Sequence, residues 1–355
     1  MSLIYFTPGP SELYPSYRKH LLMAMDLQLG SINHRSDSFR KIYKYTDEQL
    51  RLLMNIPDTH QIYFAASATE IWEKLISNCV ELESFHLTNG SFSNKFFDFA
   101  KLLKKSPKQY QVAEGEGFDV HSIEIPESSE LICTTLNETS TGVRMLENDL
   151  KFLKQKYPQK LLCSDLVSIA PYANIDFSVV DSVFFSVQKA FGMPPGLGVW
   201  IANKACLDKS SQLHAKNIHI GAHHTLQSFY TNYLKFETPS TPNVMAIYIL
   251  GKIAADMNQY GIQQIRDDIH KKSDLIYSFA EGHSDFHPFV RLTEHRSHTV
   301  AVLNTIHPAK QTIEKLQEKG FMIGSGYGVN KHNQIRIANF PSTSFVDLQK
   351  MLHGL

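Results

Sequence analysis

The sequence predicts an α/β protein organised around a mostly parallel β-sheet with helices on both faces. Short segments rich in β-branched and aromatic residues alternate with longer amphipathic segments through the first half of the chain, which is the pattern of repeated β-α units. Several short segments are apolar at nearly every position, as strands are when both faces of their sheet are buried. The predicted strands are residues 61–65, 85–88, 131–134, 160–163 and 182–187.

The helices expected between these strands follow from apolar residues spaced three and four positions apart. The clearest is residues 36–54, where Phe39, Ile42 and Leu53 fall on one side. The other predicted helices are residues 70–79, 93–103 and 149–157. Near the N-terminus, Thr7-Pro8-Gly9-Pro10 indicates a stiff turn rather than part of an element.

The pattern changes after Gly198. Residues 217–242 are polar and rich in turn formers, and two helices broken near Gly261 are expected over residues 244–280. The remaining predicted elements are a strand at 299–303, a helix at 309–319, strands at 321–323 and 334–338, and a C-terminal helix. We therefore expect a large domain over residues 16–245, and a smaller α+β domain over 246–355 that residues 1–15 join as an N-terminal strip.

Composition argues against several classes of protein. Lys plus Arg equals Asp plus Glu at 35 each in 355 residues, so no long-range field favours nucleic acid or an anionic membrane surface. No apolar run is long enough to span a bilayer, and the first residues lack the basic and apolar regions of a signal peptide. Cys79, Cys133, Cys163 and Cys206 occur singly in apolar segments, which indicates buried reduced thiols and a cytoplasmic location.

A lysine follows the last of the predicted strands. Residues 182–187 lead directly into Gln188-Lys189 and then into a loop of Gly and Pro. An amine at the end of a buried parallel strand is placed to be desolvated, and desolvation lowers the pKa of a lysine as a Schiff-base lysine requires. For this residue alone, a lysine that merely leaves the core at a strand end is the alternative.

Other polar residues follow neighbouring strands. Ser67-Ala68-Thr69 precedes a helix, where backbone N–H groups and the helix dipole favour an anion, although an ordinary helix cap explains the motif if it stands alone. Thr139 lies in a polar loop after one strand, and Asp165 follows the end of another. Because ligands of such sheets bind at the carboxyl ends of strands, we expect these groups and Lys189 to share one edge.

Pyridoxal phosphate fits this set of groups. It needs a lysine for its aldehyde, a carboxylate that keeps its ring nitrogen protonated, and backbone donors for its phosphate. Lys189, Asp165 and residues 67–69 supply groups of these three kinds. No metal site is expected, because His219 and the His223-His224 pair lack an acid partner in a zinc-protease pattern.

With these residues in place, the chain resembles the class V aminotransferases, a branch of the fold-type I enzymes that use pyridoxal phosphate. The resemblance runs from Thr7-Pro8-Gly9-Pro10 to Arg336, and within the class it is similar to the phosphoserine aminotransferases. Leu136-Asn137-Glu138-Thr139 resembles the Pro-Asn-Glu-Thr of that family, and Asn33-His34-Arg35-Ser36 resembles its N-terminal His-Arg pair. The resemblance implies a sheet of the seven-stranded type and a homodimer whose active site lies at the interface.

The resemblance also implies a role for each candidate residue. Lys189 would bind the cofactor aldehyde and move the proton, Asp165 would pair with the ring nitrogen, and Arg336 would take the substrate α-carboxylate. Thr139 and Phe92 would contact the cofactor ring, with Phe92 standing where the family usually has Trp. The residues implied for the cofactor phosphate are Ser67, Ala68, Thr69 and Gln188, with Thr238 from the second subunit. Those implied for the distal group of the substrate, again from the second subunit, are His34 and Arg35.

Several positions depart from the phosphoserine family. Thr69 stands where that family has an arginine, and residues 324–328 lack its His-Arg pair, which leaves the N-terminal His-Arg pair to recognise the substrate phosphate. Glu237 replaces a residue that is usually neutral. Ser140-Thr141-Gly142-Val143 is similar instead to the alanine/serine–glyoxylate branch.

We therefore expect transamination between phosphoserine and 2-oxoglutarate, as in serine biosynthesis. An alanine/serine–glyoxylate type of transfer and a non-catalytic protein that binds pyridoxal phosphate are the alternatives. Each of these residues, taken alone, has an ordinary structural explanation. Asp165 could be an acid at a strand end, and Arg336 could be a surface arginine. The His34-Arg35 pair could lie in a solvated turn, and Phe92 could pack in the core. Cysteine desulfurase chemistry is not expected, because no cysteine follows Cys206.

Overall fold

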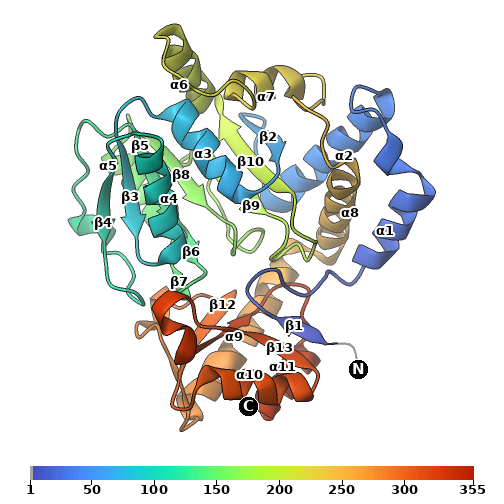
Figure 1. Ribbon diagram of the computed structural model, residues 1–355, viewed down its shortest axis with the longest axis vertical. Helices are drawn as coiled ribbons and strands as arrows, with labels where there is room; N and C mark the ends of the chain where they lie inside the picture. The colour runs from blue at the N-terminus through green and yellow to red at the C-terminus, as the bar shows by residue number, and fades with distance from the viewer. Residues whose placement is uncertain (1–2) are drawn as a thin grey trace.

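Two β-sheets organise the molecule, the larger in its upper part and the smaller in its lower part as drawn in Figure 1. The computed structural model describes residues 3–355, so residues 1 and 2 of the predicted N-terminal strip lie outside it. The larger sheet has seven strands in the order β2 (His60–Ala65), β10 (Gly198–Asn203), β9 (Ser182–Ser186), β8 (Leu161–Asp165), β5 (Leu131–Thr135), β3 (Ser84–Thr88) and β4 (Lys108–Gln111).

The larger sheet is parallel from β9 to β4, which confirms the predicted fold class. Strand β10 runs antiparallel to both of its neighbours, so β2 points in the same direction as β9. All five predicted strands are present, within two residues of the expected bounds. Two strands of this sheet were not predicted. Strand β4 lies at the sheet edge, and its sequence Lys-Gln-Tyr-Gln has no hydrophobic pattern. Strand β10 begins at Gly198, where the pattern of alternating elements was expected to end.

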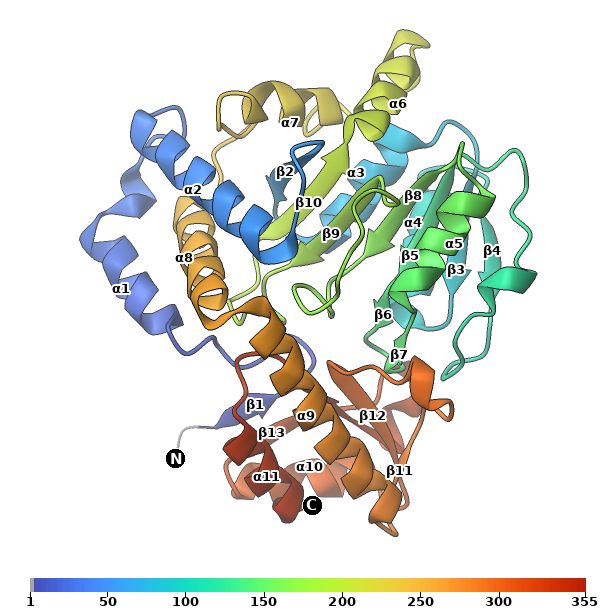
Figure 2. The same cartoon turned by 180° about the vertical axis from the view of Figure 1, so that it is seen from behind.

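Helices cover both faces of this sheet (Figures 1 and 2). The predicted helices are α2 (Asp37–Met54), α3 (Ala68–Cys79), α4 (Ser91–Leu102) and α5 (Glu147–Lys156). Helix α4 begins two residues earlier than predicted, because Glu138 accepts hydrogen bonds from its first backbone N–H groups. Three further helices were not predicted: α1 (Tyr17–Asp26), α6 (Lys204–Ala215) and α7 (Leu226–Tyr233).

Helix α7 lies in the segment that was expected to be turns. Its N-cap Thr225 accepts a hydrogen bond from the Ser228 N–H, and the helix buries Leu226 and Phe229 in the core beside β2. Two buried side chains in eight residues are too few to give a periodic signal, so tertiary packing decides this helix.

The smaller sheet contains a strand from the N-terminal strip, which the sequence did not predict as a strand. Its five strands are β1 (Ile4–Phe6), β13 (Phe321–Ser325), β14 (Gln334–Ala338), β12 (Val300–Thr305) and β11 (Phe286–Pro288). Strand β1 pairs in parallel with β13, and helices α10 (Ala309–Glu318) and α11 (Phe345–Gly354) pack on this sheet. A two-stranded hairpin of β6 (Asn137–Glu138) and β7 (Val143–Arg144) reaches toward it from the larger sheet (Figure 1).

The two parts are joined by a pair of helices, α8 (Val244–Tyr260) and α9 (Ile262–Gly282), broken at Gly261 as predicted. Helix α8 packs on α1 and α2 beside the larger sheet, and α9 continues down to the smaller sheet (Figure 2). Because α8 packs beside the larger sheet, its contacts favour a boundary between the two domains near Gly261. The boundary predicted between residues 245 and 246 stays a prediction.

The cysteines and helices agree with the expectations from composition. All four cysteines are buried free thiols. Among residues 3–355, no helix combines the length and the apolar character needed to cross a membrane.

Candidate active site

One group of candidate residues lies where the strands of the larger sheet end, facing the smaller sheet (Figure 1). Lys189 follows β9, Asp165 ends β8, and Thr139 lies in the loop of the hairpin after β5. Phe92 follows β3 in the first turn of α4, and Ser67 follows β2. The parallel register brings these carboxyl ends to a single edge, as the sequence predicted.

Lys189 is buried, with 6% of its surface exposed. Its Nζ donates a hydrogen bond of 2.7 Å to Thr139 Oγ1 and lies 5.3 Å from the centre of the Phe92 ring. Burial lowers the pKa of the Lys189 amine, while the negative charge of Asp165 acts in the opposite direction. The N-terminal strip covers this side chain, and a Cβ at Gly9 would lie 3.0 Å from Lys189 Cε.

Asp165 is the buried acid beside this lysine, with 4% exposed. Its Oδ2 accepts a hydrogen bond from Trp72 Nε1 at 3.1 Å, and its Oδ1 accepts one from the Val167 N–H at 2.8 Å. Burial raises the pKa of Asp165, and both hydrogen bonds and the charge of Lys189 oppose that rise. The site thus holds a desolvated acid and a desolvated amine on separate strands.

Arg336 approaches from β14 of the smaller sheet. Its Nε donates to the Ser325 carbonyl at 2.7 Å and its Nη1 donates to the Thr139 carbonyl at 3.3 Å. The guanidinium lies 5.3 Å from the centre of the Tyr327 ring. Burial lowers the pKa of Arg336 to about 10, so it is a cation at neutral pH. Its remaining N–H groups are available to an anion.

The start of α3 is built more tightly than an ordinary helix cap. Ser67 Oγ accepts from the Glu70 N–H at 3.1 Å, and the Ala68 N–H donates to Ser186 Oγ at 2.7 Å. A Cβ at Gly198 would lie 2.6 Å from the Ser67 carbonyl carbon, so only glycine lets β10 approach here. Because the Ala68 N–H already has a partner, Ser67 and the exposed Thr69 are the better candidates for an anion.

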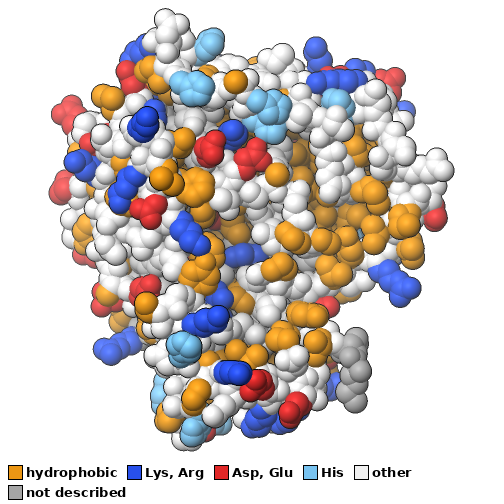
Figure 3. Space-filling view, in the orientation of Figure 1, with side chains coloured by type: hydrophobic (Ala, Val, Ile, Leu, Met, Phe, Trp, Pro, Cys, Tyr) orange, Lys and Arg blue, Asp and Glu red, His pale blue; other side chains and the backbone are white. Residues whose placement is uncertain are grey.

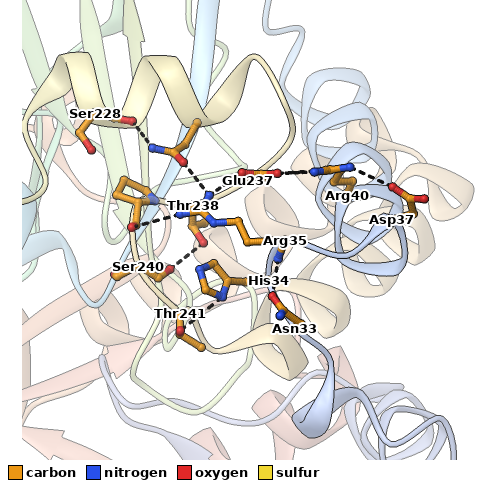
Figure 4. Close-up of polar contacts among 12 residues, drawn as sticks. Asn33, His34, Arg35, Asp37, Arg40, Ser228, Glu237, Thr238, Ser240 and Thr241 are labelled. Atoms are coloured by element: carbon orange, nitrogen blue, oxygen red, sulfur yellow. Dashed lines mark hydrogen bonds and ion pairs between the residues drawn. The ribbon is translucent and has the colours of Figure 1, made fainter.

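The remaining candidates form a second cluster around Glu237 (Figure 4). The Glu237 carboxylate accepts hydrogen bonds from Arg35 Nη1 at 2.5 Å and from Arg40 Nη2 at 2.6 Å. Thr238 Oγ1 donates to the Ser240 carbonyl at 2.7 Å, next to that pair. In the same view His34 contacts Thr241. The side-chain oxygen of Asn232 accepts a further hydrogen bond from Arg35 Nη1.

The structure therefore brings the predicted site residues together in two groups. Among residues 3–355, no hydrogen bond or ion pair joins the Glu237 cluster to Lys189, Asp165 or Arg336. Gln188 precedes Lys189 and is half-buried. Its backbone carbonyl accepts a hydrogen bond from the backbone N–H of Ser11.

Two residues that shape the site were not among the predicted ones. Trp72 holds Asp165, but on α3 it has the spacing of a core residue. Glu138 is fully buried and accepts hydrogen bonds from the backbone N–H groups of Phe92 and Ser93 at the start of α4. The signal for Glu138 was its place beside Thr139, directly after a buried strand, because an acid that is buried there requires donors.

Comparisons with known proteins agree with this geometry. The family model described as aminotransferase class-V matches residues 17–346. A crystal structure of a phosphoserine aminotransferase from Cytophaga hutchinsonii is 43% identical, with a TM-score of 0.98 over 99% of this chain and 98% of that one. The phosphoserine aminotransferase of Corynebacterium glutamicum is 26% identical over 98% of this chain and 92% of its own length. A phosphoserine aminotransferase from Trichomonas vaginalis, solved with bound PLP, shares the fold at a TM-score of 0.78, with 17% identity over 99% of each chain.

Proposed function

Because the chain belongs to the class V aminotransferases, we propose that it moves the amino group of phosphoserine to 2-oxoglutarate. It is an aminotransferase that uses pyridoxal phosphate. The observation that carries the proposal is the buried Lys189 amine beside the buried Asp165 carboxylate, with Arg336 bonded to the loop that holds the amine. The choice of phosphoserine is supported by the relatives named above.

The residues present fit pyridoxal phosphate. Its aldehyde requires an amine, its ring nitrogen a carboxylate and its ring face an aromatic ring, and Lys189, Asp165 and Phe92 supply these groups. We propose Ser67, Thr69 and Gln188 for its phosphate, because they follow strands β2 and β9, which end at the same edge of the sheet. When bound, the cofactor supplies an electron-withdrawing ring that stabilises negative charge at the Cα of the amino acid.

Each protein group then has a defined task. Lys189 Nζ accepts the proton from the substrate Cα and returns one in the second half of the reaction. The lowered pKa of this amine leaves more of it unprotonated near neutral pH, as a base requires. Asp165 holds its negative charge at the strand end because Trp72 and the Val167 N–H support it. Arg336 binds the α-carboxylate and fixes the Cα in front of the amine.

We propose that the site is completed by a second copy of the chain. The Glu237 cluster makes no hydrogen bond or ion pair to Lys189 within the described chain, yet its Thr238, His34 and Arg35 match family positions that act across a dimer interface. Helix α1 and its end expose Leu22, Met25 and Leu27, which are between 50% and 58% accessible. Figure 3 shows hydrophobic side chains gathered on this face, as expected of a surface that another subunit covers.

Mixed dimers test the shared site. Co-expressed Lys189→Ala and Arg35→Ala chains would form hybrid dimers in which one site has Lys189 from one subunit and Arg35 from the other. If the two copies pair at random, phosphoserine activity would recover to about a quarter of wild type. No recovery in hybrids isolated by two affinity tags would show that Arg35 serves its own subunit.

A donor screen tests the substrate. Phosphoserine, serine, alanine and glutamate are each mixed with the holoenzyme, and conversion of the cofactor to its amine form is followed by absorbance. We expect the largest kcat/KM for phosphoserine and complete reversal by 2-oxoglutarate. A preference for alanine or serine with reversal by glyoxylate would favour the alanine/serine–glyoxylate type instead, and no spectral change with any donor would favour a non-catalytic binding protein.

A further inference from the structure

Lys95 stands at the rim of the active site, one helical turn after Phe92. Its Nζ donates a hydrogen bond of 2.7 Å to Tyr327 Oη, and it lies 5.4 Å from the centre of the Phe92 ring and 5.2 Å from that of Tyr327. Lys189 lies over the same Phe92 ring, and Arg336 lies over the same Tyr327 ring. Lys95 therefore contacts the Phe92 ring together with Lys189, and the Tyr327 ring together with Arg336.

The charge of Lys95 is not neutralised by another side chain among residues 3–355. The side chain is exposed, and within residues 3–355 no carboxylate lies within 4.0 Å of its Nζ. Its hydrogen-bond partner is a neutral phenol, which orients the ammonium without cancelling its charge. An ammonium with three donors keeps two of them free for an anion at this rim.

The second group of cations differs in this respect. Arg35 and Arg40 both pair with Glu237, and Arg40 also pairs with Asp37 (Figure 4). Two guanidinium groups therefore face two carboxylates, and this cluster carries no net formal charge apart from His34. It can offer directed N–H groups to an anion, but little net attraction.

A phosphate ester carries a charge between about −1.5 and −2 at neutral pH, so its binding needs an uncompensated cation. Position 69 is a threonine, and residues 324–328 contain no basic side chain. We propose that Lys95 binds the phosphate group of the substrate, and that Tyr327 positions it. This inference rests on the proposed function, because it requires a phosphorylated amino donor.

The test compares phosphoserine with serine, which differs only by the phosphate, in Lys95→Met, Lys95→Arg and Lys101→Met. Lys101 is the matched control, because it is an exposed lysine on α4 that also lies over a phenyl ring, that of Phe97. We expect Lys95→Met to lower the ratio of kcat/KM for phosphoserine to that for serine about 10-fold, mainly through KM. Lys95→Arg should restore most of the ratio, and Lys101→Met should match the parent.

Tyr327→Phe provides a second measurement. It keeps the ring and removes the hydroxyl that orients Lys95, so we expect KM for phosphoserine to rise by about two- to fivefold with little change in kcat. Added to Lys95→Met, the same change should have no further effect on the ratio.

The possible results separate the two proposals. If the parent uses phosphoserine and Lys95→Met has the same ratio as Lys101→Met, Lys95 does not bind the phosphate, while the proposed function stands. If the parent does not turn over phosphoserine at all, the proposed function is wrong, and the role of Lys95 falls with it.

Discussion

Arg336→Lys tests how the substrate is held, because it keeps the positive charge and removes the forked shape. The arginine has five N–H donors, of which two are used by the carbonyl groups of Ser325 and Thr139. A lysine has one nitrogen, which would have to serve those carbonyls and the substrate together. Losing one charge-assisted hydrogen bond costs about 1.5–3 kcal/mol, which corresponds to a fall in kcat/KM of about 10- to 150-fold.

The assay measures kcat/KM of Arg336→Lys for phosphoserine and for serine by the absorbance of the bound cofactor. Both donors have the same α-carboxylate, so the two values should fall by the same factor. A fall for phosphoserine alone would mean that Arg336 binds the phosphate, and the assignment of the α-carboxylate would be wrong. An unchanged midpoint of urea unfolding shows that the variant is folded.

Three further predictions follow from buried groups. Asp165→Asn removes the negative charge and keeps the shape, so kcat should fall more than about 100-fold with cofactor still bound, and near-normal turnover would contradict its role. Trp72→Phe removes a hydrogen bond that lowers the pKa of Asp165, so the acidic limb of the kcat profile should move to higher pH, and an unmoved limb would exclude this link. Burial lowers the pKa of Lys272 to about 8 from 10.5, so the unfolded chain holds this proton more tightly between those pH values. Relative to Lys272→Met, the parent should therefore gain about 2 kcal/mol of unfolding free energy from about pH 7.5 to about pH 10, and a constant difference in urea titrations would contradict the shift.

The parts of the site that were predicted lie at the ends of apolar strands. Lys189 and Asp165 each follow a segment whose burial is evident from its composition, so their position and desolvation could be inferred together. Trp72 could not be assigned, because a tryptophan on a helix has the same spacing whether it packs in the core or donates to an acid. Lys95 could not be assigned from the sequence either, because exposed lysines are common on helices. Only the folded chain places Tyr327 beside it.

The strands and helices also differ in how well the sequence predicts them. The central strands and long helices were predicted because many residues contribute to one hydrophobic pattern. Strand β1 has three residues and α7 has eight, so each depends on partners that are distant in sequence. The pairing of β1 with β13 and the burial of Phe229 beside β2 supply what the local sequence lacks.

The central claim is that the Lys189 amine is the one that bonds to the cofactor. Borohydride reduction of the holoenzyme followed by peptide mass spectrometry tests this directly, because reduction fixes the cofactor to its lysine permanently. We expect a phosphopyridoxyl group on Lys189 and an unmodified Lys95. A modification on any other lysine, or none after loading with pyridoxal phosphate, would contradict the account.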